Sequence, residues 1–218
     1  MGISAIGLDV DGTLYPNGAM RRLSVPRVLR RLRLFLAYRR VRDHLRTIGR
    51  VGDFYAEQAR LLGAELGITP AEAQDRIDRY IYEDLASALE GIRPFPDLAD
   101  VIIDLKESGL RIGLLSDFPF GSKLDLLGLP NLWDCLICAE EVGALKPHPE
   151  PFRALARCLD TPAEQMLYVG NSYENDIVGA KGAGMQAAHL STRARRESVA
   201  DVTFADYGAL LAWIARNR

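Results

Sequence analysis

The chain lacks the features that would place it in several broad classes of protein. Its 218 residues contain no apolar run near the roughly 20 residues that a membrane-spanning helix needs. A formal net charge of −2 gives no general argument for binding nucleic acid. The N-terminus has no basic region followed by an apolar stretch and a cleavage site. We therefore expect a cytoplasmic protein without nucleic-acid or membrane partners.

Cysteine is scarce, and the odd number of three argues against a disulfide framework. Cys135 and Cys138 form a C-x-x-C pattern in an apolar, strand-like run. A spacing of three places their side chains on opposite faces of a strand. No second pair completes a zinc site. We expect buried free thiols, with redox or metal chemistry as the alternative.

The apolar pattern predicts strands that alternate with helices. Strands are expected from Ile3 to Val10 and over residues 111–116, 134–139, 166–170, 185–190 and 202–204. Helices are expected over 97–109, 149–159, 174–184 and 207–217. This alternation predicts an α/β fold with a mostly parallel sheet covered on both faces. Thr69 and Thr161, each followed by Pro-Ala-Glu, predict capping boxes at two helix starts.

A long helical stretch, roughly residues 20–90, interrupts this alternation directly after the first strand. It indicates an inserted helical subdomain over 16–92, which leaves 1–15 and 93–218 as the core. Residues 21–50 hold eleven arginines against a single acid, Asp43. Val28, Leu29, Leu32 and Leu36 give one helix there an apolar face opposite a cationic one. A solvated arginine face is the simplest interpretation; collection of an anionic substrate and contact with a membrane or nucleic acid are the alternatives.

Polar side chains follow several of the predicted strands where each strand ends. In open α/β sheets, ligands bind outside the carboxyl ends of the strands. We therefore expect a carboxylate pair, a hydroxyl, an ammonium and an Asn/Asp pair to converge on one crevice. The residues are Asp9, Asp11, Ser116, Asp117, Lys146, Asn171 and Asp176.

In these residues the sequence resembles the haloacid dehalogenase-like hydrolases that carry a helical cap after the first motif. The D-x-D-G-T-L motif runs from Asp9 to Leu14, and Ser116, Lys146-Pro147 and Gly170-Asn171 through Asp176 match the next three motifs in order. The resemblance implies a Rossmann-like three-layer core with an inserted all-α cap. It also implies a Mg²⁺-dependent phosphomonoester hydrolase that acts on a small phosphorylated metabolite through an aspartyl-phosphate.

The resemblance assigns Asp9 as the nucleophile and Asp11 as the general acid and base. A phosphate dianion 4 Å from a carboxylate costs about 8 kcal/mol at an effective dielectric of 20, so cations must intervene. Mg²⁺ and Lys146 would supply that charge. The implied catalytic residues are Asp9, Asp11, Ser116 and Lys146. The implied substrate contacts are Gly12, Thr13, Ser116, Asp117 and Lys146. The implied metal ligands are Asp9, Asp11, Asn171 and Asp176.

Four further features refine this expectation. Asp11 favours a phosphatase over a carbon–halogen hydrolase, which needs no acid there, and the absence of lysine from residues 16–92 weighs against phosphonate cleavage. Two positions depart from the family pattern. Asn171 stands where the fourth motif usually has Asp, and Asp117 stands where Asn or a small residue is common. A weakened or non-catalytic relative that binds a phosphorylated ligand is therefore the alternative.

Overall fold

The computed structural model describes residues 2–193 and 195–217, without the side chains of residues 19, 21 and 85. Six strands form one sheet in the order β3-β2-β1-β4-β5-β6, and all neighbouring pairs are parallel. This confirms the predicted α/β fold. The strands are β1 (Ala5–Leu8), β2 (Arg111–Ser116), β3 (Cys135–Cys138), β4 (Met166–Gly170), β5 (Gln186–Leu190) and β6 (Val202–Phe204).

The helices fall into two groups along the chain. The first five of the helices between β1 and β2 are called the inserted helices here: α1 (Asn17–Arg30), α2 (Leu32–Ile48), α3 (Phe54–Leu66), α4 (Pro70–Ile77) and α5 (Asp84–Ser87). A π-helical stretch over Asp78–Glu83 joins α4 to α5. The remaining helices are α6 (Leu98–Glu107), α7 (Lys123–Leu126), α8 (Ala139–Val142), α9 (Pro149–Cys158), α10 (Gly179–Gly182) and α11 (Tyr207–Asn217).

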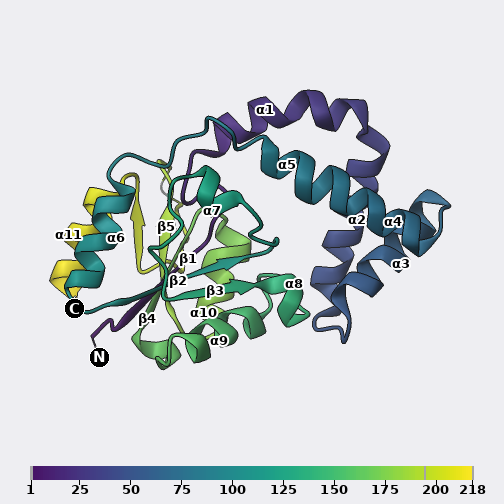
Figure 1. The fold of residues 1–218 in the computed structure, drawn as a ribbon. Helices are drawn as coiled ribbons and strands as arrows, with labels where there is room; N and C mark the ends of the chain where they lie inside the picture. The colour runs from purple at the N-terminus through teal and green to yellow at the C-terminus, as the bar shows by residue number, and fades with distance from the viewer. Residues whose placement is uncertain (1, 194, 218) are drawn as a thin grey trace.

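Helices cover both faces of the sheet (Figure 1), as the alternating pattern predicts. On one face, Ile6 and Leu8 of β1 pack with residues of α6 and α11, such as Ile102 and Leu210. Ala5 points to the other face, where Leu155 of α9 packs. Successive strand residues point to opposite faces. The buried, nearly continuous apolar strands are therefore the consequence of having helices on both sides.

The inserted helices lie to one side of the sheet (Figure 1). The predicted apolar face through Val28, Leu29, Leu32 and Leu36 is only partly correct. The helix breaks at Arg31, between α1 and α2. Leu29, Leu32 and Leu36 are exposed, although Leu32 and Leu36 line an open cavity together with Val28. The pattern predicts one continuous helix, whereas the helix breaks and Leu29 lies outside that lining.

Two other expectations are corrected by the tertiary structure. Cys135 of β3 and Cys158 at the end of α9 form a disulfide, so only Cys138 is the buried free thiol that we expected. The capping box at Thr69 is present, with its hydroxyl accepting from the Glu72 N–H. Thr161 instead donates its hydroxyl to the Leu159 carbonyl, and a short 3₁₀ turn over Ala163–Gln165 follows in place of a helix.

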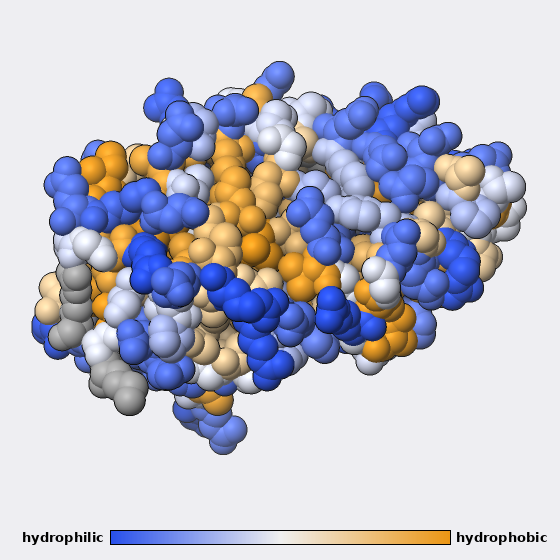
Figure 2. All heavy atoms as spheres, turned by 60° about the horizontal axis from the view of Figure 1, so that its bottom comes forward, coloured by the Kyte–Doolittle hydropathy of each residue, from blue (hydrophilic) through white to orange (hydrophobic). Residues whose placement is uncertain are grey.

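The surface of the molecule is mixed in polarity. Figure 2 shows hydrophobic side chains gathered near the middle of one face, with hydrophilic side chains over much of its periphery. Among the helices that the structure describes, none combines the length and apolar character that crossing a membrane requires.

Candidate active site

The sheet order places the ends of β1, β2 and β4 side by side. Strand order reverses on either side of β1, because β2 and β4 both pair with it. Such a switch point opens a crevice at the carboxyl ends of the strands. A cavity of about 160 Å³ lies there. Its lining residues are Asp9, Asp11, Arg46, Asp117, Phe118, Lys146, Asn171, Ser172, Asn175 and Asp176.

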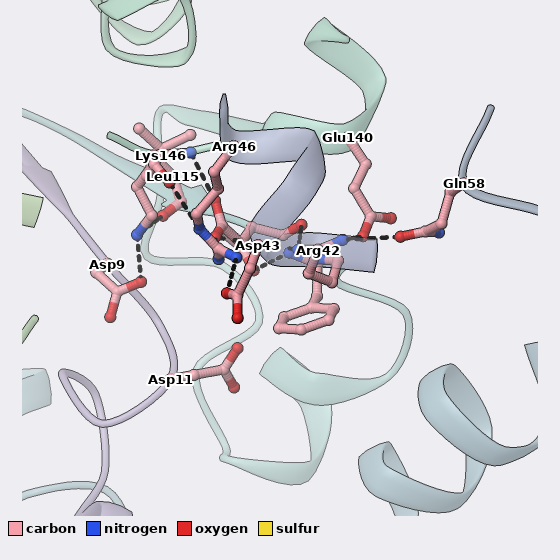
Figure 3. A network of polar contacts seen from close by, with 12 residues as sticks. Asp9, Asp11, Arg42, Asp43, Arg46, Gln58, Leu115, Glu140 and Lys146 are labelled. Atoms are coloured by element: carbon pink, nitrogen blue, oxygen red, sulfur yellow. Dashed lines mark hydrogen bonds and ion pairs between the residues drawn. The ribbon is translucent and has the colours of Figure 1, made fainter. Parts of the chain in front are cut away.

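Lys146 is the buried cation at the centre of this cavity. Its Nζ lies 2.6 Å from Oδ1 of Asp9 and 2.7 Å from Oδ1 of Asp176, and it donates to the Tyr168 hydroxyl at 3.2 Å. Figure 3 shows Lys146 facing Asp9, which comes from the segment after β1. Burial lowers the pKa of Lys146, but the charges of Asp176 and Asp9 outweigh it and raise the pKa well above its usual value. Lys146 is therefore charged.

The charge of Lys146 does not fully offset the effects that make the ionised form of Asp9 unfavourable. Its burial, followed by the nearby charge of Asp176, raises the pKa of Asp9 to about 7, although Lys146 acts in the opposite direction. Two buried carboxylates thus share one ammonium group. This leaves an excess of negative charge at the carboxyl end of β1, where a further cation would be stabilised.

The second oxygen of Asp9 is held by the turn that follows β1. Thr13 donates its hydroxyl to Oδ2 of Asp9 at 2.9 Å and lies 3.3 Å from Oδ1 of Asn171. Gly12 in this turn has φ of +91°, and a Cβ there would lie 2.4 Å from the Asn171 amide nitrogen. Only glycine therefore allows both the turn and the close approach of Asn171. Gly12 and Thr13 shape the site and do not line the cavity.

Asp11 faces the cavity from the same turn. Lys123 lies 3.2 Å from its Oδ2, and the Tyr15 hydroxyl donates to its Oδ1. Burial raises the pKa of Asp11, but the charge of Lys123 and these hydrogen bonds outweigh it and lower the pKa below its usual value. Asp11 is therefore ionised. No motif in the sequence marks Lys123, because only the fold brings α7 to this turn.

Ser116 ends β2 and Asp117 follows it, but the two differ in what they offer to a ligand. Asp117 accepts from the backbone N–H of Lys146 at 3.0 Å through Oδ1, and its Oδ2 lies 2.6 Å from Nη2 of Arg46. Both of its oxygens therefore already have protein partners. Ser116 is fully buried and lies outside the cavity lining, with its Oγ accepting from the Phe118 N–H at 3.0 Å. Contact of either residue with substrate stays a prediction.

Two arginines of α2 reach the core at this point, and the sequence did not single them out. Arg46 donates through Nε to the Lys146 carbonyl at 3.0 Å and lines the cavity. Arg42 is only 3% exposed and pairs with the fully buried side chain of Glu140. Figure 3 shows both arginines on one side of their helix. Residues at i and i+4 share a helix face, so the spacing of four in the sequence indicates that the two arginines lie on the same side of α2.

The metal ligands implied by the resemblance lie around one cavity. Asp9, Asp11, Asn171 and Asp176 all line it. In the described part of the chain, no three Asp, Glu, His or Cys side chains group closely enough to hold a metal ion. The implied set uses only two side-chain carboxylates, together with the Asn171 amide oxygen and the Asp11 carbonyl. Such uncharged oxygens also suit Mg²⁺.

The fold resembles known structures along nearly its whole length. A HAD phosphatase from Thermococcus onnurineus matches with a TM-score of 0.66 and 21% identity, covering 99% of this chain and 100% of that one. A 2-haloacid dehalogenase from Pseudomonas syringae matches with a TM-score of 0.69 and 23% identity, covering 98% and 99%. Likeness at this level of identity shows a shared fold.

The amino-acid sequence is also similar to those of known proteins. A glyceraldehyde 3-phosphate phosphatase of Methanothermobacter thermautotrophicus is 29% identical over 94% of this chain and 96% of its own length. A phosphoglycolate phosphatase of Salmonella choleraesuis is 34% identical over 87% of this chain and 81% of its own length. The family model described as haloacid dehalogenase-like hydrolase matches residues 3–184. The chain therefore belongs to the haloacid dehalogenase-like hydrolases.

Proposed function

We propose that the protein is a Mg²⁺-dependent phosphatase that hydrolyses a small phosphomonoester through an aspartyl-phosphate on Asp9. The observation that carries this proposal is the buried contact of 2.6 Å between Asp9 and Lys146 at the carboxyl end of β1. An ammonium group beside the carboxylate reduces its repulsion of a phosphate. The relatives named as phosphatases support the same reaction class.

The residues of the cavity fit a magnesium ion. Asp9 and Asp176 are buried carboxylates that share one ammonium group, so their negative charge exceeds the positive charge of Lys146. Asn171 and the Asp11 carbonyl would complete an all-oxygen set, which Mg²⁺ prefers. When bound, Mg²⁺ neutralises the phosphoryl oxygens and the attacking carboxylate.

The remaining steps can be assigned to side chains of this chain. Asp9 would attack phosphorus while the bond to the substrate alcohol breaks, and Asp11 would give that alcohol oxygen its proton. A phosphate dianion nearby raises the pKa of Asp11, because like charges disfavour ionisation. Water would then attack the aspartyl-phosphate, with Asp11 accepting its proton and phosphate leaving. Lys146 and Arg46 would hold the phosphoryl oxygens.

We further propose that residues 16–92 act as a cap over this site, with 1–15 and 93–218 as the catalytic core. In support, α1 to α5 lie between β1 and β2 in sequence, and Arg46 of α2 lines the same cavity as Asp9. A cap that contributes a cation to the cavity would also exclude water from the phosphoryl group.

Substitution of the nucleophile tests the proposal. With p-nitrophenyl phosphate, we expect turnover by the unaltered protein to require Mg²⁺ and to stop with a chelator. Asp9→Asn should lower kcat by at least about a thousandfold. Asp100→Asn, an exposed carboxylate on α6, is the matched control and should leave kcat unchanged. Circular dichroism reports whether both variants fold.

Retained turnover in a folded Asp9→Asn variant would remove the nucleophile assignment. Tight binding of phosphorylated ligands without turnover at any Mg²⁺ concentration would favour the alternative, a non-catalytic binding protein.

A further inference from the structure

A second cavity, of about 290 Å³, adjoins the polar one. It lies between the inserted helices and the segment after β2. Asp11 and Phe118 line both cavities, so the two adjoin at those side chains. We call this second space the apolar cavity, because most of its lining residues are apolar or aromatic. They include Met20, Val28, Phe35, Ile81, Phe118 and Pro119.

The apolar cavity offers no unpaired cation among its described lining residues. Lys123 is the one cation there, and it already lies 3.2 Å from the Asp11 carboxylate. A third cavity, lined by Val28, Leu32 and Leu36 among others, also contains arginines. Two of them are closely paired, Arg42 with Glu140 and Arg46 with Asp117, whereas Arg39 is exposed and lies 3.8 Å from Asp43.

Ser24 provides a second, independent observation. Its side chain lines the apolar cavity, is 9% exposed, and its Oγ has no hydrogen-bond partner among the described residues. A buried hydroxyl without a partner is unfavourable unless a ligand or water satisfies it. One polar group in an otherwise apolar wall is typical of a pocket that orients a mainly apolar ligand.

Asp11, the proposed general acid, links the apolar cavity to the proposed phosphoryl transfer. It stands at the junction between the cavity that contains Asp9 and Lys146 and the cavity lined by Val28 and Phe35. An acid that protonates the leaving oxygen must lie within hydrogen-bond reach of the oxygen that bridges phosphorus and the alcohol carbon. With the phosphoryl group beside Asp9 and that oxygen beside Asp11, the alcohol would extend toward the apolar cavity.

We propose that the substrate is a phosphomonoester whose alcohol carries an apolar body, aliphatic or aromatic, that fills the apolar cavity. This inference rests on the proposed phosphatase function and deepens it. A carboxylate such as that of phosphoglycolate would meet only one cation among the described residues of this cavity, Lys123, which is held by Asp11. The substrate class would then differ from those in the names of the relatives.

The test measures the binding of n-alkylphosphonates, from methyl to hexyl, to the full chain with Mg²⁺ by isothermal titration calorimetry. We expect the affinity to rise about fourfold for each added methylene until the cavity is filled. 3-Phosphonopropionate, close in size to butylphosphonate but with a carboxylate at its end, should bind at least tenfold more weakly than butylphosphonate. Affinity that is independent of chain length, or tighter binding of the carboxylate analogue, would overturn the inference.

A matched pair of variants locates the effect. Ala86 lines the apolar cavity, whereas Ala64 is exposed on α3 and lies outside it. Ala86→Leu should shrink the cavity and reduce the gain from methyl- to hexylphosphonate by at least fivefold. Ala64→Leu should keep the gain of the unaltered protein. An equal gain in both variants, each folded by circular dichroism, would place the apolar contact elsewhere and overturn the inference.

Turnover of the corresponding n-alkyl phosphates separates the two proposals. Hydrolysis with kcat/KM that does not increase with chain length would overturn the substrate class and leave the phosphatase function standing. An affinity series that rises with chain length, without hydrolysis of any ester, would overturn the phosphatase function and support the apolar ligand site.

Discussion

Asp9, Lys146 and Asp176 show at the scale of single residues how the chain tolerates charges in its core. Each is at least nine-tenths buried, yet each has an oppositely charged partner within 2.7 Å. Burying an ion is costly unless it is paired, so these groups are stable only as a set. The amide of Asn171 adds an oxygen to that set without a further charge. The departure from Asp at this position therefore reduces the attraction for a cation.

Replacing Asn171 by the acid tests this account of the metal site. Asn171→Asp should lower the Mg²⁺ concentration for half-maximal activity about tenfold, because a carboxylate attracts the cation more strongly than an amide does. Mg²⁺ titration of turnover measures it. Asn175→Asp, the same change at another residue of the cavity, should give a smaller effect. Equal effects of the two variants would mean that any added negative charge in the cavity strengthens Mg²⁺ binding. Asn171 would then not be a ligand.

At the scale of elements, α2 contributes a buried ion pair to the contact between the inserted helices and the core. Arg42 stacks on Phe118, with its guanidinium 4.4 Å from the ring centroid, and donates to the Asp117 carbonyl at 3.1 Å. Glu140 of α8, its ion-pair partner, also accepts from the Tyr82 hydroxyl at 2.7 Å. The low dielectric of the interior strengthens a buried network of this kind and makes a member that loses its partner costly.

Removing one member should therefore be costly. We expect Arg42→Met to lower the free energy of unfolding by about 3 kcal/mol, because Glu140 would stay buried without its partner. Arg39→Met, on an exposed residue of the same helix whose pair with Asp43 spans 3.8 Å, should change it by less than about 0.5 kcal/mol. Urea denaturation measures both. Similar losses in the two variants would contradict a special role for the buried pair.

At the scale of the whole molecule, the site is assembled from segments far apart in the chain. Asp9, Lys146 and Asp176 follow different strands of one parallel sheet, and Arg46 comes from the inserted helices. The unfolded chain does not hold these groups together. A ligand that binds only the assembled site therefore stabilises the folded state.

Mg²⁺ should act as such a ligand. At a hundred times its Kd, it should raise the free energy of unfolding by about 2.7 kcal/mol relative to a sample with chelator. Asp176→Asn should cut this gain to below about 1.4 kcal/mol at the same Mg²⁺ concentration, since each tenfold loss of affinity removes that amount. Asp100→Asn should retain the full gain. Urea denaturation with and without Mg²⁺ measures it, and a full gain in Asp176→Asn would exclude that residue as a ligand.

The sequence by itself determined the sheet, the run of helices after β1 and the convergence of Asp9, Lys146 and Asp176. These features depend on local patterns, namely apolar strands, capping residues and polar residues directly after strands. Only the tertiary structure decided that Cys135 bonds to Cys158, that Arg42 is buried, and that Lys123 reaches Asp11. Each of these depends on the packing of segments far apart in the chain. No local pattern records such contacts, because many partners are compatible with the same local sequence.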